Sequence, residues 1–425
     1  MGRLTSRVAV SLLVALGLVA LSPLDAAAPR PTPAPRPADD TEVRGLWVLR
    51  SSLASPEKIQ ELVRTAAAGG FNTLMVQVRG RGDSYFLGGV EPRADELASQ
   101  PADFDPLETT LAAAHAAGIK VHAWFNVNLV SSATTLPRSR DHVVARHPGW
   151  LMVPRALAST LSRVDPRNPA YVGQLARWTR AESETVEGLY LSPIPEPSQH
   201  YTIDVVRALV QRYDLDGLHL DYIRYPSAEF DYGPEALAAF AEHVRASLPE
   251  AEVRRIESLR TRDALAWVRA YPDAWTSFRE RRLTTLVARI RDVARQARPT
   301  LVLSAAVVPG ADDARARKLQ DWSGWAQAGL LDVVCPMAYA VEAPAFASQI
   351  EDATRAAGTV PVWAGIGAWR LPVAQAADHL RVARRSGVAG ILLFSYDGLV
   401  STDPRGAYFN QLRPVLVEPR SSDRR

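Results

Sequence analysis

The run from Tyr213 to Pro226 ends an apolar strand pattern with a carboxylate. Side chains of a strand alternate between its two faces, so Leu218 and Leu220 lie on one face while His219 and Asp221 lie on the other. A carboxylate at the last inward position of a buried strand is costly unless it is paired or used in chemistry. The pattern therefore predicts Asp221 as a catalytic carboxylate.

The residues near Asp221 also offer a purely structural interpretation. Its carboxylate could form a salt bridge with Arg224, or with Arg79 from another strand. His219 lies one layer deeper, where a supporting hydrogen bond to Asp221 is expected. We count His219, Tyr222 and Arg224 among the candidate substrate-binding residues.

A second polar run, Val76–Phe86, follows another apolar strand pattern. Alternation points Gln77 and Arg79 inward, and Arg79, Arg81 and Asp83 then occupy a glycine-hinged loop at the same end as Asp221. Arginine there can pair with a carboxylate or bind sugar hydroxyls. The alternative is an Arg–Asp network that only holds the loop, and the sequence leaves both interpretations open.

Aromatic and amide side chains at further strand ends complete the candidate site. Trp124 and Asn126 share one face of their strand; indole rings stack on the apolar faces of sugars, and an amide both donates and accepts hydrogen bonds. For Trp124 a core position is the alternative. Later strand ends supply four more candidate substrate-binding residues: Tyr339, Trp369, Tyr396 and Asp397.

These residues are positioned by alternating strand and helix patterns along a 425-residue chain. Eight strands, each followed by a helix, predict an α/β fold, a (β/α)8 TIM barrel. A helix end, a glycine and then a strand recur, as expected for a left-handed helix C-cap. The expected strands are Val43–Leu49, Asn72–Arg79, Lys120–Asn126, Gly217–Tyr222, Leu301–Val307, Leu331–Ala338, Val360–Ile366 and Ala389–Tyr396.

The expected helices leave two stretches longer than ordinary loops. Long insertions, 127–201 and 224–285, follow strands three and four, at the face where barrel enzymes build their sites. The second contains helical patterns at Glu235–Ser247 and Glu252–Arg269. The other expected helices are Pro56–Ala68, Pro106–Ala117, Tyr201–Tyr213, Leu283–Ala297, Asp321–Ala328, Ala345–Ala357, Pro372–Ser386 and Ala407–Val415.

The N-terminus has the pattern of an export signal. Basic residues precede an apolar run and small residues, which predicts a signal peptide over 1–28 and a periplasmic or extracellular protein; an uncleaved anchor is the alternative. A proline-rich tether, 29–41, precedes the barrel at 42–417 and a disordered tail at 418–425. No integral membrane domain is expected after signal removal.

Composition and cysteine usage narrow the function classes. The net charge is +3 and the arginines are scattered, which argues against nucleic acid as a partner. The single cysteine, Cys335, lies in an apolar run and is expected to be a buried, inert thiol. Neither a metal nor an organic cofactor is implied, and the oligomeric state is not predicted.

Several of these runs, in order, resemble the glycosyl-hydrolase-like 10 family. The matching segments are Arg44–Trp47, Gln77–Tyr85, His122–Asn126, Asp216–Pro226, Pro336–Tyr339 and Phe394–Tyr396. The resemblance implies an exported barrel that hydrolyses a polysaccharide, with peptidoglycan lacking stem peptides as one substrate class. Tyr222 stands where many relatives carry a second acid. The run from Asp216 to Pro226 also resembles the fourth strand of chitinases. Ile223 occupies the position of their proton donor, so a chitinase mechanism is not supported.

The sequence and the family resemblance lead to two hypotheses about function. A glycoside hydrolase needs two carboxyl groups flanking the bond, and Asp83 is our choice as partner of Asp221. Asp397 is a second strand-end candidate, while three glutamates reach the site only if their loops fold inward: Glu187, Glu196 and Glu342. The alternative function is a non-catalytic glycan-binding or scaffolding barrel.

Overall fold

The computed structural model describes residues 42–403 and 406–419. The predicted signal peptide and tether lie outside the described residues, as does most of the predicted tail. Within the described ranges, none of the helices combines the length and apolar character needed to cross a membrane.

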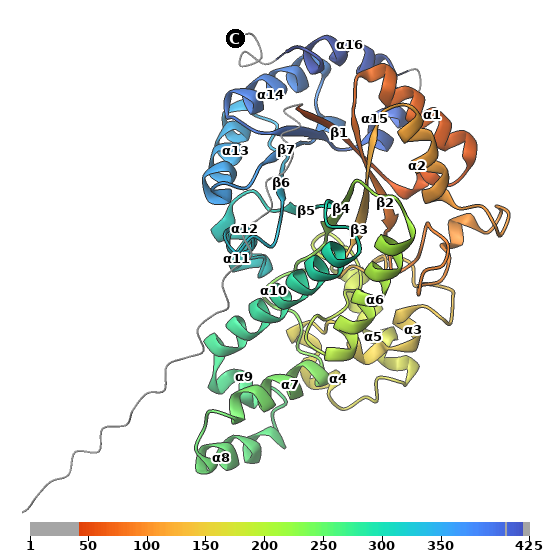
Figure 1. Ribbon diagram of the computed structural model, residues 1–425. Helices are drawn as coiled ribbons and strands as arrows, with labels where there is room; N and C mark the ends of the chain where they lie inside the picture. The colour runs from red at the N-terminus through yellow and green to blue at the C-terminus, as the bar shows by residue number, and fades with distance from the viewer. Residues whose placement is uncertain (1–41, 404–405, 420–425) are drawn as a thin grey trace, which may run out of the picture. The chain divides into compact units, whose positions relative to one another are not determined.

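Eight parallel strands form a closed barrel in sequence order, with β1 paired to both β2 and β8 (Figure 1). The predicted TIM-barrel fold is therefore confirmed. All eight strands fall within the ranges expected from the sequence: β1 Val43–Val48, β2 Thr73–Arg79, β3 Lys120–Asn126, β4 Gly217–Asp221, β5 Val302–Val307, β6 Val333–Ala338, β7 Trp363–Ile366 and β8 Gly390–Leu393.

Helices surround the barrel, and several of them begin at a proline. Pro272 opens α10 eleven residues before the expected start, because proline suits the first helical turn, where no partner is needed for its missing N–H. Glycines with positive φ follow α2 and α14, at Gly118 and Gly387, as the recurring motif predicts. The helices that cover the barrel are α1 Pro56–Gly69, α2 Pro106–Ala116, α6 Glu196–Arg212, α10 Pro272–Ala297, α11 Ala311–Lys318, α12 Trp322–Gln327, α13 Ala343–Ala357, α14 Val373–Arg385, α15 Tyr396–Thr402 and α16 Ala407–Leu416.

Further helices lie between β3 and α6 and between β4 and α10. They pack around two apolar clusters, one within the first insertion and one formed by the second insertion together with Ala158 and Ile194 of the first. Figure 1 places both groups at one end of the barrel. The expected helix Glu252–Arg269 is two helices, because Asp263 accepts a hydrogen bond from the Leu265 N–H in a turn between them. The inserted helices are α3 Val143–Arg146, α4 Ala158–Leu161, α5 Pro169–Ala181, α7 Pro234–Arg245, α8 Glu250–Arg260 and α9 Ala266–Ala270.

Short 3-10 turns connect several elements: η1 Arg50–Leu53, η2 Asp95–Leu97, η3 Pro148–Trp150, η4 Arg155–Leu157 and η5 Ala368–Arg370. The first two matter for function, because η1 directly follows β1 and η2 lies in the long connection between β2 and α2.

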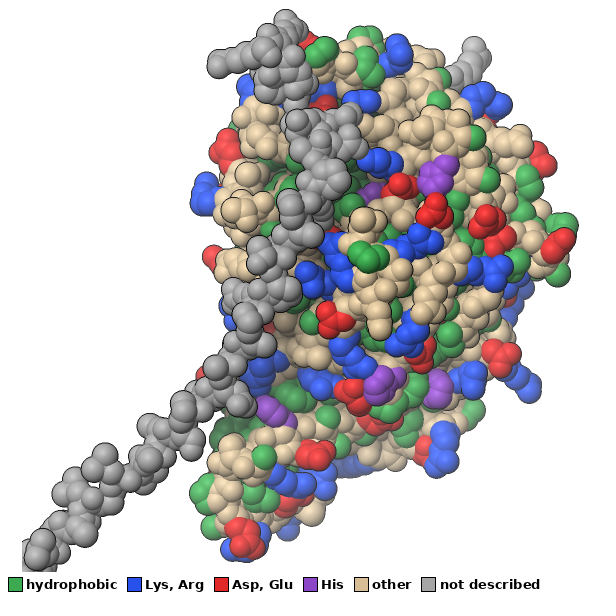
Figure 2. All heavy atoms as spheres, in the orientation of Figure 1, with side chains coloured by type: hydrophobic (Ala, Val, Ile, Leu, Met, Phe, Trp, Pro, Cys, Tyr) green, Lys and Arg blue, Asp and Glu red, His purple; other side chains and the backbone are tan. Residues whose placement is uncertain are grey.

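The inside of the barrel is a separate apolar cluster that includes Trp47, Trp124, Cys335 and Trp363. Cys335 is buried, and burial raises the pKa of its thiol, as expected for an inert cysteine. The outer surface carries mixed charges: on the face in Figure 2, basic and acidic side chains are interspersed, without a patch of one sign.

Candidate functional site

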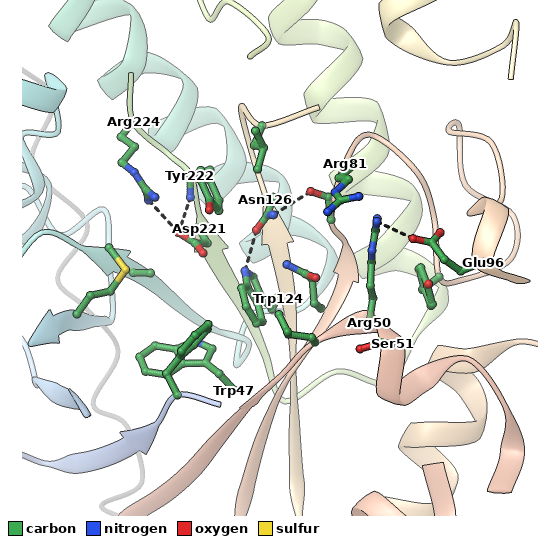
Figure 3. A pocket seen from close by; sticks show the side chains of 18 of the residues that line it. Trp47, Arg50, Ser51, Arg81, Glu96, Trp124, Asn126, Asp221, Tyr222 and Arg224 are labelled. Carbon is green, nitrogen blue, oxygen red and sulfur yellow. Dashed lines mark hydrogen bonds and ion pairs between the residues drawn. The ribbon is translucent and has the colours of Figure 1, made fainter. Parts of the chain in front are cut away.

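A pocket of about 490 Å³ opens at the carboxyl ends of the strands. Its lining combines two acids, three arginines and several aromatic rings (Figure 3). Such a mixture of apolar walls and a few convergent polar groups is typical of small-molecule and glycan sites. The charged and aromatic lining residues are Asp221, Glu96, Arg50, Arg81, Arg224, Trp47, Tyr85, Trp124, Tyr222, Tyr339 and Phe394.

Asp221 ends β4 and lies in this pocket with 7% of its surface exposed. Its Oδ1 accepts hydrogen bonds from the Tyr222 backbone N–H at 2.6 Å and from Arg224 Nη1 at 2.9 Å. Within the described residues Oδ2 accepts no hydrogen bond. One oxygen is thus fixed in place while the other is free to meet a substrate atom.

Arg224 holds Asp221 from the turn after β4. Its guanidinium lies over the Tyr222 ring, 4.1 Å from the centroid, and Tyr222 has a φ of +50°. A bulky residue with positive φ is rare and such strain clusters at functional sites. Burial lowers the pKa of Arg224, but Asp221 and other neighbours more than offset this, so the net shift is upward. The salt bridge considered in the sequence analysis is therefore made to Arg224.

Arg79 does not reach the pocket, contrary to the prediction that it contacts substrate. The β2–β3 register shifts between Gln77 and Arg79, so Arg79 aligns with Phe125 on the outer face of the barrel. There it is fully buried, with two hydrogen bonds to Glu91 and others to backbone carbonyls of the β3 end. A β-bulge of this kind re-aims a side chain, and alternation alone cannot reveal it.

His219 supports the barrel interior and makes no hydrogen bond to Asp221, which corrects both expectations for it. Its Nε2 accepts from Trp47 Nε1 at 3.0 Å, and its Nδ1 lies 2.9 Å from Ser304 Oγ. Because Nε2 accepts, the proton sits on Nδ1 and donates to the serine. Burial lowers the pKa of His219 to about 3, so the ring is neutral.

Asp83, our choice of second carboxylate, is directed away from the main pocket. Both of its oxygens lie 3.0 Å from Arg50 Nη1, and Oδ1 also accepts from the Arg81 N–H. It lines an adjoining hollow instead. The Arg–Asp network considered for this loop is thus present, with Arg50 as its cation.

Glu96 is the second acid in the pocket, and it is not among the site residues predicted from the sequence. Its Oε1 accepts from Arg50 Nη2 at 2.7 Å, and its side chain is 44% exposed. Arg50 lies two residues after the end of β1. The rule that polar residues at strand ends are site candidates would therefore have identified Arg50. Glu96 lies in η2, and nothing in its spacing signals the site.

Trp124 and Asn126 both line the pocket, as their strand positions suggested. The Asn126 Oδ1 accepts from Trp124 Nε1 at 2.8 Å, and its Nδ2 donates to the Gly80 carbonyl at 2.9 Å. The amide therefore ties β3 to the β2 loop. Trp124 is only 3% exposed and packs in the apolar cluster inside the barrel, so it belongs to the core as well as to the pocket wall.

Tyr339 lines the pocket, and Trp369 lies beside it on the rim. Their rings meet edge to face with centroids 5.0 Å apart, and Trp369 is 39% exposed. Trp369 is not part of the pocket lining itself, although Phe394, which it also contacts, is. Its predicted contact with substrate therefore applies only to a ligand that extends past the rim.

Tyr396 and Asp397 do not face the pocket, which corrects their assignment as substrate contacts. The last strand ends at Leu393, and both residues belong to α15. Tyr396 is buried against Phe409. Asp397 accepts from the Leu49 N–H at 2.6 Å and from the hydroxyls of Ser51 and Ser52, so it fixes the end of β1.

The three alternative glutamates differ in their distance from the site. Glu187 Oε1 lies 3.9 Å from Arg224 Nη2 and accepts from Tyr190, but does not line the pocket. Glu196 pairs with arginines of α10, and Glu342 is exposed before α13. Among residues 42–403 and 406–419 no cluster of three or more metal-ligating side chains occurs.

Sequence comparison identifies a matching family model and curated relatives. The family model described as Glycosyl hydrolase-like 10 matches residues 42–366. Glycosyl hydrolase YngK of Bacillus subtilis (strain 168) is 24% identical over 204 residues, 44% of this chain and 34% of YngK. Glycosyl hydrolase DigH of Escherichia coli (strain K12) is 33% identical over 157 residues, 36% of this chain and 30% of DigH. The matches thus span about a third of these curated relatives.

Solved structures share the barrel. The glycoside hydrolase domain of PgaB (BpsB) from Bordetella bronchiseptica has a TM-score of 0.57 at 15% identity, covering 89% of this chain and 100% of that domain. The α-L-fucosidase isoenzyme 2 from Paenibacillus thiaminolyticus also has a TM-score of 0.57 at 15% identity, covering 90% of this chain and 50% of the fucosidase. At this identity the likeness establishes the fold.

Proposed function

The chain belongs to the Glycosyl hydrolase-like 10 family, and we propose that it hydrolyses glycosidic bonds with Asp221 and Glu96 as its two carboxyl groups. The observation that carries the proposal is their presence in one pocket whose wall also contains six aromatic side chains. Glycosidases of the two-carboxylate type need this pair on either side of the scissile bond.

The surroundings of the two acids suit different roles. Asp221 is held rigidly by Arg224 and Tyr222 and leaves one oxygen free, which fits a base or nucleophile. Glu96 is more exposed and is held by one arginine; we assign it the remaining role, protonation of the leaving oxygen, which requires that it leave the ion pair with Arg50 and take up a proton, because that pairing favours the ionised form. Arg81 and Tyr339 supply hydrogen bonds and ring contacts to the sugars.

The substrate we propose is a polysaccharide of the bacterial cell wall or a related glycan, with peptide-free peptidoglycan as the first to test. Family membership and the aromatic pocket wall support a glycan. The export pattern before residue 42 supports an envelope substrate.

The test is release of reducing ends from a panel of polysaccharides that includes peptide-free peptidoglycan. We expect Asp221→Asn and Glu96→Gln to lower kcat by roughly 10²–10⁴ while the circular dichroism spectrum stays that of the wild type. Glu351→Gln, an exposed change on α13, is the control and should retain activity. The anomer released first distinguishes retention from inversion.

A non-catalytic glycan-binding barrel is the second candidate, and one observation favours it. Both pocket acids are already paired with arginines, Asp221 with Arg224 and Glu96 with Arg50. If the wild type and Asp221→Asn bind the same glycans equally and neither cleaves them, the binding function replaces the hydrolase.

A further inference from the structure

A second hollow of about 350 Å³ adjoins the main pocket. Three residues line both: Arg50, Arg81 and Glu96. These shared side chains form the boundary between the two hollows. A ligand that occupies both hollows would therefore contact them. Each volume falls within the range of roughly 300–1,000 Å³ of small-molecule sites, so a ligand longer than one pocket can continue into the other.

Arg81 stands at this boundary with an unused guanidinium. Its side chain is exposed, and within the described part of the chain it makes no hydrogen bond or ion pair, although its backbone N–H donates to Asp83. Arg50, by contrast, is committed to Asp83 and Glu96. A free fork of donors beside a glycan pocket is suited to sugar hydroxyls and to carboxylates.

The far wall of the hollow comes from segment 131–139 of the insertion after β3. It presents hydroxyls of Ser132, Thr135 and Ser139, together with Arg138 and the 37% exposed Leu136. An exposed apolar side chain among hydroxyl and guanidinium donors matches the two aspects of a sugar ring, which has an apolar face and a polar edge.

The hollow is held in shape by His142. Its Nδ1 accepts from the Val144 N–H, so its Nε2 carries the proton and donates to the Arg81 carbonyl at 2.8 Å. Gly82, at a φ of +73°, lets the loop pass this ring, because a Cβ there would lie 2.9 Å from Nε2. The loop that carries Arg81 is thus fixed against the insertion before any ligand arrives, which lowers the cost of binding.

We propose that this adjoining hollow binds the sugar units that follow those in the main pocket, so that the protein acts on chains rather than on short fragments. The inference rests on the proposed function for the identity of the ligand as a glycan. Arg81 bridges the two parts, and Arg138 and Leu136 contact only the longer ligand.

Binding by chain length tests this. Asp221→Asn protein, which holds ligand without turnover, is titrated calorimetrically with peptide-free peptidoglycan fragments from disaccharide to octasaccharide. We expect affinity to rise with length and then level off. Adding Arg138→Ala should weaken the longest fragments about tenfold, as one charge-assisted hydrogen bond would, and leave the disaccharide unchanged.

Arg140→Ala is the matched control, since Arg140 is exposed directly after segment 131–139 but does not line the hollow. It should bind every fragment as its parent does. Length-independent affinity, equal weakening of all fragments by Arg138→Ala, or no binding of any fragment would each overturn the inference. Absence of cleavage by the wild type, with length-dependent binding intact, would refute only the hydrolase proposal.

Discussion

Arg224 donates a hydrogen bond of 2.9 Å to Asp221, and both side chains are almost completely buried. The pair allows a carboxylate to stand at the bottom of a pocket lined with aromatic rings, where an uncompensated charge would be costly. Stability and function are therefore coupled at this position.

We expect Arg224→Ala to lower the free energy of unfolding by about 3–5 kcal/mol, because it leaves Asp221 buried without its partner. The same substitution in an Asp221→Asn background should cost clearly less. Urea denaturation of the four proteins in this cycle measures the difference. Arg385→Ala, exposed at the end of α14, should change stability by no more than about 0.5 kcal/mol. Equal costs in both backgrounds would contradict the coupling.

Arg79 and Glu91 form a fully buried ion pair, and Tyr201 also donates to Glu91. Arg79→Ala should therefore destabilise the protein by about 3–5 kcal/mol. Arg81→Ala, two residues further on and exposed, should leave the melting temperature nearly unchanged while weakening glycan binding. If the Arg79→Ala protein were stable and showed only a raised KM, the result would support the substrate-binding role predicted for Arg79 from the sequence.

The barrel could be predicted because the sequence pattern of each strand is local. An apolar run preceded by a helix C-cap glycine is a signal within some ten residues, and all eight strands carry an apolar run. The same local rule placed Asp221, Trp124 and Asn126 correctly in the pocket. Alternation works for these residues because their strands keep a regular pleat up to the last residue.

The rest of the site depends on features that a strand pattern does not contain. The bulge in β2 turns Arg79 to the outer face, and the early end of β8 places Tyr396 and Asp397 in a helix. Arg50 and Glu96 come from separate 3-10 turns, and their contact is a product of how the β2–α2 connection folds. Such long-range pairing leaves no trace in local spacing.

The buried carboxyl group of Asp231 leads us to expect an unusual pH dependence of stability. It is fully buried, and burial raises its pKa to about 7, opposed by a hydrogen bond from Ser192 and the charge of Arg279. The folded pKa lies above the unfolded value of about 3.9. The neutral acid therefore contributes stability that is complete below about pH 4 and is lost as the pH rises through about 7, on the order of 4 kcal/mol.

Asp231→Asn should abolish this contribution, so that the variant loses less stability than the wild type between pH 4 and about pH 8. Asparagine tolerates the φ of +83° at this position. Unfolding free energies across the pH range give the difference curve. Asp352→Asn, exposed on α13, should run parallel to the wild type. A parallel curve for Asp231→Asn would mean that the carboxyl is ionised in the folded protein.

Glu96 and Asp83 share Arg50 as a partner and both line the adjoining hollow, but only Glu96 also lines the main pocket. Substituting each in turn therefore distinguishes a catalytic carboxylate from one that only holds Arg50. If Glu96 is the second catalytic group, Glu96→Gln should lower kcat by roughly 10²–10⁴ on long and short substrates alike. Asp83→Asn removes one charge from the same network without touching the reacting bond, so kcat should fall less than about tenfold. Steady-state kinetics on peptide-free peptidoglycan, with melting temperatures to confirm folding, compare the two. The reverse order of effects would restore Asp83 as the partner of Asp221 and would require the loop at 80–84 to reorganise when substrate binds.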